Sequence, residues 1–318
     1  MALFTRTAIG RLQISLLTIA EAAPFAHGMF YDGHLVEHGF SSLAEAALNS
    51  VLTKGSTSVD HLHIPLPYAE IRTRIMTMIN AYGQPVGDAL PDWKAPAFPE
   101  HTPMYGRFCR LEPLNPSDHG ESLFVANSLD PDARAWTYLP YGPFTEYSAY
   151  QSWLNQQATS KDPLFFAIID LHTQKAVGLA AYLRIDVDVG VIEVGHLKFS
   201  NLMQRTPIST EAMFLMAQSA FHQGYRRYEW KCDALNQPSR SAAERLGFTF
   251  EGIFRQARVV KGRNRDTAWY SILGCEWPTL AQCIAQWLAR ENFDEQQRQR
   301  MSLQEIRKAV LSPSSTRI

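Results

Sequence analysis

The segment from Val191 to Phe221 constrains the fold more than any other part of the chain. It begins with the β-branched run VIEVGHLKF, which is typical of a strand, and continues through a polar loop into a helix-forming run. Apolar residues of that run recur at the spacing of one helical face: Ala212, Met213, Met216, Ala217 and Ala220. We expect Glu211, Gln218 and His222 on the opposite, polar face. The sequence therefore predicts a strand, a short loop and an amphipathic helix.

The loop before this helix, residues 204–209, has the features of an anion-binding site. Thr206 suits the N-cap, and Pro207 suits the first helical position because its ring fixes φ where the N–H would be unpaired anyway. The N–H groups of Ile208 to Thr210 would then point out of the helix start, with the positive end of the helix dipole behind them. This pattern predicts a site for a phosphate or pyrophosphate, although many helices begin in this way and bind nothing.

The run QRTPISTEA, together with NQPSRSAAERLGF further along, resembles the acyl-CoA-binding segments of the GNAT superfamily of N-acetyltransferases. The similarity is greatest to the ribosomal-protein N-terminal acetyltransferase (RimJ/RimL-like) type and extends from about Tyr82 to Asn292. It implies an α+β GNAT fold, in which a mixed, mostly antiparallel central sheet is flanked by helices and two strands splay around the acyl-CoA site. One departure is that Pro207 and Ser209 stand where the family usually has small residues, and Pro207 removes one backbone donor.

The resemblance also implies acetyl-CoA as the cofactor. The pantetheine arm would pair like an additional strand between the strand ending near Phe199 and the strand at 228–233, and Gly195 is expected to supply a bulge that opens the gap. A backbone N–H near residues 196–198 would stabilise negative charge on the thioester oxygen. The implied cofactor-binding residues are Leu197, Phe199, Gln204, Arg205, Thr206, Pro207, Ile208, Ser209, Thr210, Asn236 and Arg240.

Two residues match positions that carry chemistry in the family. Glu193 lies where relatives place a carboxylate facing the acceptor, so it is the candidate base, acting through water; alternatively it faces solvent or pairs with an arginine. Ser239 matches a serine near the thiol sulfur, where it would donate a hydrogen bond to the thiolate or relay a proton; alternatively it caps the helix at 238–246. An α-amine has a pKa near 8, against about 10 for lysine, so an N-terminal acceptor hardly requires a strong base.

The aromatic segment WTYLPYGPF is either a packing plug or, as the resemblance implies, the cover of the acceptor groove, with Trp136, Tyr138 and Tyr141 lining it. We expect an enzyme that transfers an acetyl group to a primary amine by direct attack on the thioester, with a protein or peptide N-terminal amine favoured. The alternatives are a small amine, such as an amino acid, a polyamine or an amine antibiotic, and a non-catalytic acyl-CoA-binding module, which Pro207 keeps open. His196 is expected to be an ordinary strand histidine.

Composition excludes several classes of protein. The 30 Lys and Arg residues balance 31 Asp and Glu residues, which argues against nucleic-acid binding. The four cysteines have no CxxC spacing, which favours free thiols in a reducing compartment, and no residue cluster has the spacing of a metal site. No apolar run approaches 18 residues, so no membrane span is expected. We expect a cytoplasmic protein, with a homodimer as an open option.

We expect four regions. Residues 1–75 form an N-terminal extension, either an over-long start or a small helical module with helices at 9–23 and 42–52. Residues 76–103 form a Pro-rich arm, 104–277 the acetyltransferase domain, and 278–318 the C-terminal helices and tail. Expected strands are 105–113, 164–170, 176–185, 191–199, 228–233, 248–254 and 267–273, with a charged turn at 260–266. Expected helices are 115–127 with Ser117 as its cap, 145–158, 238–246, 278–290 and 303–310.

Overall fold

The structure, a computed structural model, describes residues 30–31, 34–35, 78–296 and 298–311. Contacts divide the chain into two units, Met1–Leu90 and Pro91–Ile318. In the first unit, four short strands pair antiparallel as β1 with β2 and β3 with β4. These are β1 (Phe30–Tyr31), β2 (His34–Leu35), β3 (Met78–Ile79) and β4 (Pro85–Val86). The helices expected at 9–23 and 42–52 lie outside the described residues.

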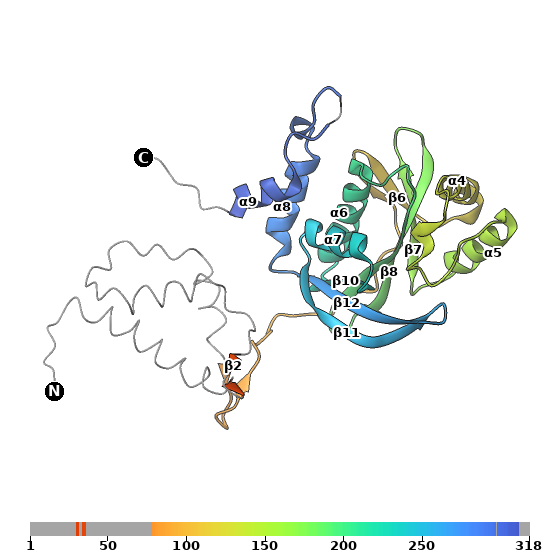
Figure 1. The fold of residues 1–318 in the computed structure, drawn as a ribbon. Helices are drawn as coiled ribbons and strands as arrows, with labels where there is room; N and C mark the ends of the chain where they lie inside the picture. Colours follow the sequence, from red (N-terminus) through yellow and green to blue (C-terminus); the bar gives the residue numbers. More distant parts are fainter. Residues whose placement is uncertain (1–29, 32–33, 36–77, 297, 312–318) are drawn as a thin grey trace, which may run out of the picture. The chain divides into compact units, whose positions relative to one another are not determined.

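An eight-stranded sheet forms the centre of the second unit (Figure 1). Its strands are β5 (Met104–Tyr105), β6 (Cys109–Pro113), β7 (Leu164–Asp170), β8 (Lys175–Asp186), β9 (Val191–Phe199), β10 (Arg227–Asp233), β11 (Thr249–Val260) and β12 (Arg263–Leu273). The strand order is β11-β12-β10-β9-β8-β7-β6-β5. Within this sheet β9 and β10 are parallel, and the other neighbours are antiparallel. The predicted β7–β8–β9 meander and the mixed, mostly antiparallel α+β architecture are confirmed.

Helices cover both faces of the sheet. They are α4 (Pro116–Ser128), η1 (Arg134–Trp136), α5 (Tyr147–Ala158), α6 (Pro207–His222), α7 (Gln237–Leu246), α8 (Trp277–Leu288), η2 (Arg290–Asn292) and α9 (Leu303–Leu311). Helices α6 and α7 bury their apolar side chains against one face, and α4 and α5 pack against β7 and β8 on the other. No helix among these described elements is long and apolar enough to span a membrane.

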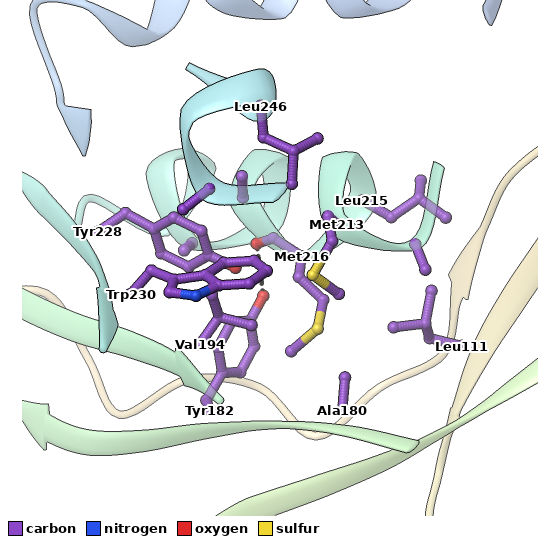
Figure 2. Packing of buried hydrophobic residues seen from close by; sticks show 14 of the residues in the cluster. Leu111, Ala180, Tyr182, Val194, Met213, Leu215, Met216, Tyr228, Trp230 and Leu246 are labelled. Carbon is purple, nitrogen blue, oxygen red and sulfur yellow. Dashed lines mark hydrogen bonds between the residues drawn. The ribbon is translucent and has the colours of Figure 1, made fainter. Parts of the chain in front are cut away.

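The larger core lies between α6 and the sheet. Figure 2 shows Tyr182, Trp230 and Met216 filling the space beneath the helix, with Leu246 of α7 above them. The buried Tyr182 hydroxyl donates a hydrogen bond to the Met216 carbonyl, so its polar end is satisfied inside the core. This packing fixes α6 against β8, β9 and β10, the strands on which the candidate site is built.

The Pro-rich segment from Pro91 onward is attached to the second unit by hydrogen bonds at several points. The Tyr225 hydroxyl donates to the Ala97 carbonyl at 3.0 Å, and the Gln223 side chain accepts from the Glu100 N–H at 2.8 Å. The His101 ring lies 2.8 Å from the Phe165 carbonyl. An extended, proline-containing chain cannot pair with itself, so these contacts from the sheet and from α6 supply its order.

The β11–β12 hairpin is longer than the sequence predicts. Residues 255–260 and 263–266, expected outside the strands, belong to them, and the turn is reduced to Lys261–Gly262. The expectation was wrong because irregularities between Phe250 and Gly252 and between Phe254 and Arg258 break the two-residue period. Since this part of the hairpin is rich in arginine, no apolar alternation marks it as a strand.

Helix starts also differ from expectation. The cap of α4 is Asn115, whose side chain accepts from the Ser117 N–H at 3.0 Å, and not Ser117 itself. Similarly, Asn236 caps α7 by accepting from the Ser239 N–H at 3.2 Å. In both cases an asparagine just before a proline-containing first turn takes the cap, because its side chain reaches the exposed N–H groups. Helix α5 begins at Tyr147, two residues later than predicted.

The expected exposure of Glu211 was wrong. This α6 residue is 3% exposed, and its carboxylate accepts hydrogen bonds from three consecutive N–H groups, of Arg107, Phe108 and Cys109, at 2.7, 2.6 and 2.8 Å. The absence of a side chain at Gly106 makes room for this contact, since a Cβ there would lie 2.4 Å from the carboxylate carbon. Glu211 therefore fastens the entry to β6 onto α6.

We expect Glu211→Ala to lower the free energy of unfolding by about 3 kcal/mol, because charge-assisted bonds are lost and buried N–H groups stay unpaired. Urea denaturation of both proteins measures the difference. The exposed Gln218 lies on the same helix, so Gln218→Ala is the control, with an expected change within about 0.5 kcal/mol. A loss below 1 kcal/mol for Glu211→Ala would contradict the fastening role.

Candidate active site

Strands β9 and β10 part in the middle of the sheet. Their parallel pairing runs from Val191 opposite Arg227 to Val194 opposite Trp230 and then stops, although β9 continues to Phe199. Beyond Val194, the edge of β9 that faces β10 has no strand partner in the described part of the chain. The backbone there can pair with an extended ligand as it would with a strand.

The residue that opens this gap is His196, and the expectation that Gly195 supplies the bulge was wrong. His196 has φ of +51°, and the β8–β9 register shifts here, with Ala181 opposite Gly195 and Leu179 opposite Lys198. A positive φ is costly for a residue with a side chain and needs support from its surroundings. The support is the Tyr141 ring, which stacks on the imidazole at 5.6 Å, with the hydroxyl 3.1 Å from Nδ1.

The start of α6 lies just beyond β9. Thr206 is its N-cap and Pro207 its first residue, as predicted. The Thr206 hydroxyl, however, donates to the Met203 carbonyl at 2.8 Å, and no side chain of the described residues caps the helix N–H groups. Arg205, exposed and with φ of +60°, precedes it. A cavity of about 450 Å³ opens beside this helix start and includes Arg107 and His172 in its lining.

Several of the other residues predicted to bind the cofactor have side chains that are packed in the core or hydrogen-bonded within the protein. Leu197 and Phe199 direct their side chains into the α6 core, and Gln204 donates to the Phe199 carbonyl at 2.8 Å. Thr210 is buried and accepts a hydrogen bond from Arg245. Arg240 donates to the Tyr270 hydroxyl at 3.0 Å, so part of its guanidinium is occupied inside the protein.

Ser239 lies on α7, beside the end of β10. Its hydroxyl oxygen accepts a hydrogen bond from the Trp230 indole at 3.0 Å, and it also lies against the thiol of Cys232, whose pKa is raised mainly by burial. Asn236 performs the helix capping that was the alternative role for Ser239. The Ser239 hydroxyl is therefore held between the Trp230 indole, from which it accepts, and the Cys232 thiol.

Glu193 is buried, at 3% exposure, in a network of ion pairs on the face opposite α6. Its Oε2 atom forms an ion pair with the Lys231 Nζ atom at 2.9 Å and accepts a hydrogen bond from Arg184. Its Oε1 atom lies toward Gly195, where an added Cβ would be 3.6 Å away, and receives no donor from the described residues. One carboxylate oxygen is thus held by two cations while the other lies beside Gly195.

The aromatic segment crosses the gap. The Tyr138 hydroxyl donates to the Leu235 carbonyl, just after β10, at 3.2 Å, and Tyr141 contacts His196 of β9. Trp136 is 4% exposed and packs against Tyr141 and Phe144, so its role in the structure is that of a plug. Tyr138 and Tyr141 thus connect the segment to both splayed strands.

Two titratable groups near the gap have strongly shifted pKa values. Burial lowers the pKa of His196 to about 4, with a further lowering by the positive charges of Arg184, Arg258 and Arg265, so the imidazole is neutral at pH 7. Burial also lowers the pKa of Lys198 to about 8. The Lys198 Nζ lies 4.6 Å from the centre of the Trp136 ring and has no hydrogen-bond partner among the described residues.

Known proteins agree with this geometry. Residues 109–249 match the family model described as an acetyltransferase (GNAT) domain. A crystal structure of a GCN5-related N-acetyltransferase from Brucella melitensis is 49% identical and superposes with a TM-score of 0.68 over 69% of this chain and 100% of the other. A probable GNAT-family acetyltransferase from Chromobacterium violaceum is 38% identical, with a TM-score of 0.57 over 61% and 98% of the two chains. An uncharacterised N-acetyltransferase of Bacillus licheniformis is 26% identical over 149 residues, 46% of this chain and 84% of its own.

The chain therefore belongs to the GNAT superfamily of acetyltransferases. It is an N-acetyltransferase, and its acyl donor is acetyl-CoA, as in the rest of that superfamily. Two observations on the described residues fit this donor: none of their side chains caps the helix N–H groups after Pro207, and none of their strands pairs with the edge of β9 beyond Val194. The residues that would hold it are those at the α6 start and along 196–199.

Several features of the site were missed by the sequence reasoning. The positive φ of His196 has no sequence signal, because any residue can occupy a bulge. Arg258 lay outside the predicted strands and Arg265 lay in the predicted turn, so their pairing across two strands was hidden. Lys198 in a strand suggests an exposed face, and only the position of η1 above β9 buries it.

Lys198→Met is expected to stabilise the protein at pH 7. The folded-state pKa of about 8 lies below lysine's ordinary value of 10.5, so the unfolded chain binds more protons between pH 8 and 10.5 and wild-type stability rises with pH in that window. The full penalty applies below pH 8, where the variant should be more stable by about 2–3 kcal/mol. Urea denaturation at pH 7 and pH 10 tests this; an advantage that does not shrink at pH 10 would contradict a buried, costly charge.

Proposed function

We propose that the protein acetylates the α-amine at the N-terminus of a peptide or protein, as the ribosomal-protein (RimJ/RimL-like) type does. The observation that carries the proposal is the state of two side chains at the gap that could accept a proton. Glu193 is ion-paired with two cations, and burial lowers the pKa of His196 to about 4. Such groups suit an amine with a pKa near 8, a fraction of which is neutral at pH 7, better than a lysine with a pKa above 10.

The proposed roles of the side chains follow from their placement. Glu193 Oε1, directed toward the gap beside Gly195, accepts the ammonium proton directly or through water. Ser239 donates its hydroxyl proton toward the departing sulfur. Tyr138 and Tyr141 bound the acceptor groove. In the transfer, the acceptor nitrogen bonds to the acetyl carbonyl carbon, the bond from that carbon to sulfur breaks, one proton leaves the nitrogen and one reaches the thiolate.

The charges near His196 help to distinguish between the possible acceptors. Arg184, Arg258 and Arg265 all act on His196 and Asp162 opposes them, so positive charge is in excess where a polyamine or an amine antibiotic would bring further positive charge. A non-catalytic acyl-CoA-binding module would need no directed carboxylate oxygen. These observations favour the peptide acceptor and turnover over both alternatives.

The cell compartment, the domain boundaries and the oligomeric state are also part of the proposal. All four cysteines are free, and three of them are buried, which supports a reducing compartment such as the cytoplasm. The acetyltransferase domain is proposed to span 104–277, preceded by the arm at 76–103 and by an extension at 1–75. A homodimer remains part of the proposal, and size measurement in solution tests it.

Two peptides of one sequence test the acceptor class. One has a free α-amine and an acetylated lysine, and the other has an acetylated α-amine and a free lysine. At pH 7 we expect kcat/KM for the α-amine peptide to be higher by about 100-fold, from the neutral fractions of the two amines. Thiol release from acetyl-CoA measures both rates. Faster turnover of the lysine peptide, or of spermidine, would overturn the proposal.

Glu193→Gln is expected to lower kcat/KM for the α-amine peptide at least tenfold at pH 7. The loss should shrink toward pH 9, where the amine is already neutral without a base. Glu251→Gln removes another carboxylate of the same ion-pair network, one that pairs with Arg227, and serves as the control for general destabilisation. A pH-independent loss in Glu193→Gln, equal to that in the control, would assign Glu193 a purely structural role.

A further inference from the structure

The β11–β12 hairpin places two arginines opposite each other. Arg258 and Arg265 are cross-strand partners, so their side chains leave the hairpin on the same face. Arg265, Trp269 and Ser271 alternate along β12 on the face away from α6, because Ala268 and Tyr270 lie in the α6 core. Like charges directly opposite each other destabilise a hairpin, so this pair needs a compensating contact.

The described residues provide no such contact. Neither Arg258 nor Arg265 forms an ion pair or a hydrogen bond there, and the Arg265 Nε atom is buried without an acceptor. A buried guanidinium N–H without a partner is costly, since the group has lost its water. Arg265 is also repelled by Arg258 and Arg184, which Asp233 and, more weakly, Cys232 oppose.

The neighbouring ion pairs show the contrast. On the same face, the carboxylates of Glu193, Glu229 and Glu251 are bound by Arg184, Lys231 and Arg227, three acids to three bases. That network is balanced. The two hairpin arginines lie at the border of this network, and no carboxylate of the network pairs with them. One further carboxylate, supplied by a ligand, would balance their charge.

The excess charge lies beside the reacting position. Arg258 and Arg265 are both close enough to His196 to oppose its protonation, and His196 occupies the bulge where β9 leaves β10. The hairpin tip is also held over this region, because Lys261 donates to the Trp136 carbonyl at 2.9 Å. The arginines face away from α6, so they are not positioned for the phosphates expected at its start.

We propose that Arg258 and Arg265 bind a carboxylate of the acceptor, so that the preferred substrate is a peptide with an acidic residue at or next to its N-terminus. The inference rests on the proposed function for the identity of the amine, but the carboxylate site itself does not require turnover. Two guanidinium groups offer planar, paired donors that match a carboxylate. The acceptor's negative charge then orients the α-amine toward Glu193 Oε1.

Peptides that differ only in the first residue test the proposal on the full-length protein. With N-terminal Glu, Gln and Lys versions, we expect kcat/KM to be at least tenfold higher for Glu than for Gln, and lowest for Lys. The acetylated product peptides, labelled with a fluorophore, should bind in the same order when measured by anisotropy without acetyl-CoA. Equal values for Glu and Gln in both measurements would overturn the proposal.

Variants of the hairpin locate the effect. Arg258→Gln should reduce the Glu-to-Gln ratio to below threefold, and Arg258→Glu should reverse the order of the Glu and Lys peptides. Arg255→Gln is the matched control on the same strand: Arg255 acts on Asp266, which the alternation along β12 places on the other face. An equal fall of the ratio in Arg255→Gln would show an effect of net charge only and would also overturn the proposal.

The outcomes separate the two proposals. One outcome is that no peptide is acetylated but the Glu product peptide binds more tightly than the Gln product peptide, in a way that depends on Arg258. This would contradict the proposed acceptor and support the carboxylate site. If peptides are acetylated at equal rates whatever their first residue, the result supports the proposed function and contradicts the carboxylate site. Turnover of free glutamate in preference to every peptide, lost in Arg258→Gln, would keep the carboxylate site and assign it to a small amino acid.

Discussion

The site depends on the place where β9 stops pairing with β10. A parallel pair buried in the middle of a sheet normally continues to the end of its strands, because unpaired backbone groups there are costly. Here the pairing ends at Val194 and Trp230, and the bulge at His196 turns β9 away. The unpaired edge, the uncapped start of α6 and the Ser239 hydroxyl all border the same gap. The parts proposed to bind the acyl donor are thus consequences of one interruption in the ladder.

The rest of the fold holds that interruption in place. The α6 core packs on β8, β9 and β10, and Glu211 ties α6 to the entry of β6 through three N–H bonds. On the opposite face, the Tyr141 ring supports the strained His196, and the aromatic segment reaches Leu235 beyond the gap. Strain at one residue is tolerable because both faces of the sheet are packed around it.

The charged side chains on the sheet face opposite α6 form two groups. The ion pairs around Glu193 use every carboxylate of that network and leave it balanced, whereas the hairpin carries arginines without partners. Buried charges are stable only when they are paired, so a balanced network fixes the strands. The unbalanced part is where a charged ligand gains the most. This division supports the proposal that the acceptor has an α-amine and a nearby carboxylate.

The sequence by itself determined the α+β architecture, the β7–β8–β9 meander and the cap and proline that start α6, because these follow from short-range periodicity and from the conformational limits of proline. It did not determine which residue forms the bulge, which way Glu211 faces, or that the arginine-rich residues belong to the strands of the β11–β12 hairpin. The first two depend on contacts between residues far apart in the chain, His196 with Tyr141 and Glu211 with Arg107, and the third depends on the pairing of Arg258 with Arg265 across the hairpin. Local pattern specifies the elements, and the packing of one element on another decides which polar groups are buried, paired or left for a ligand.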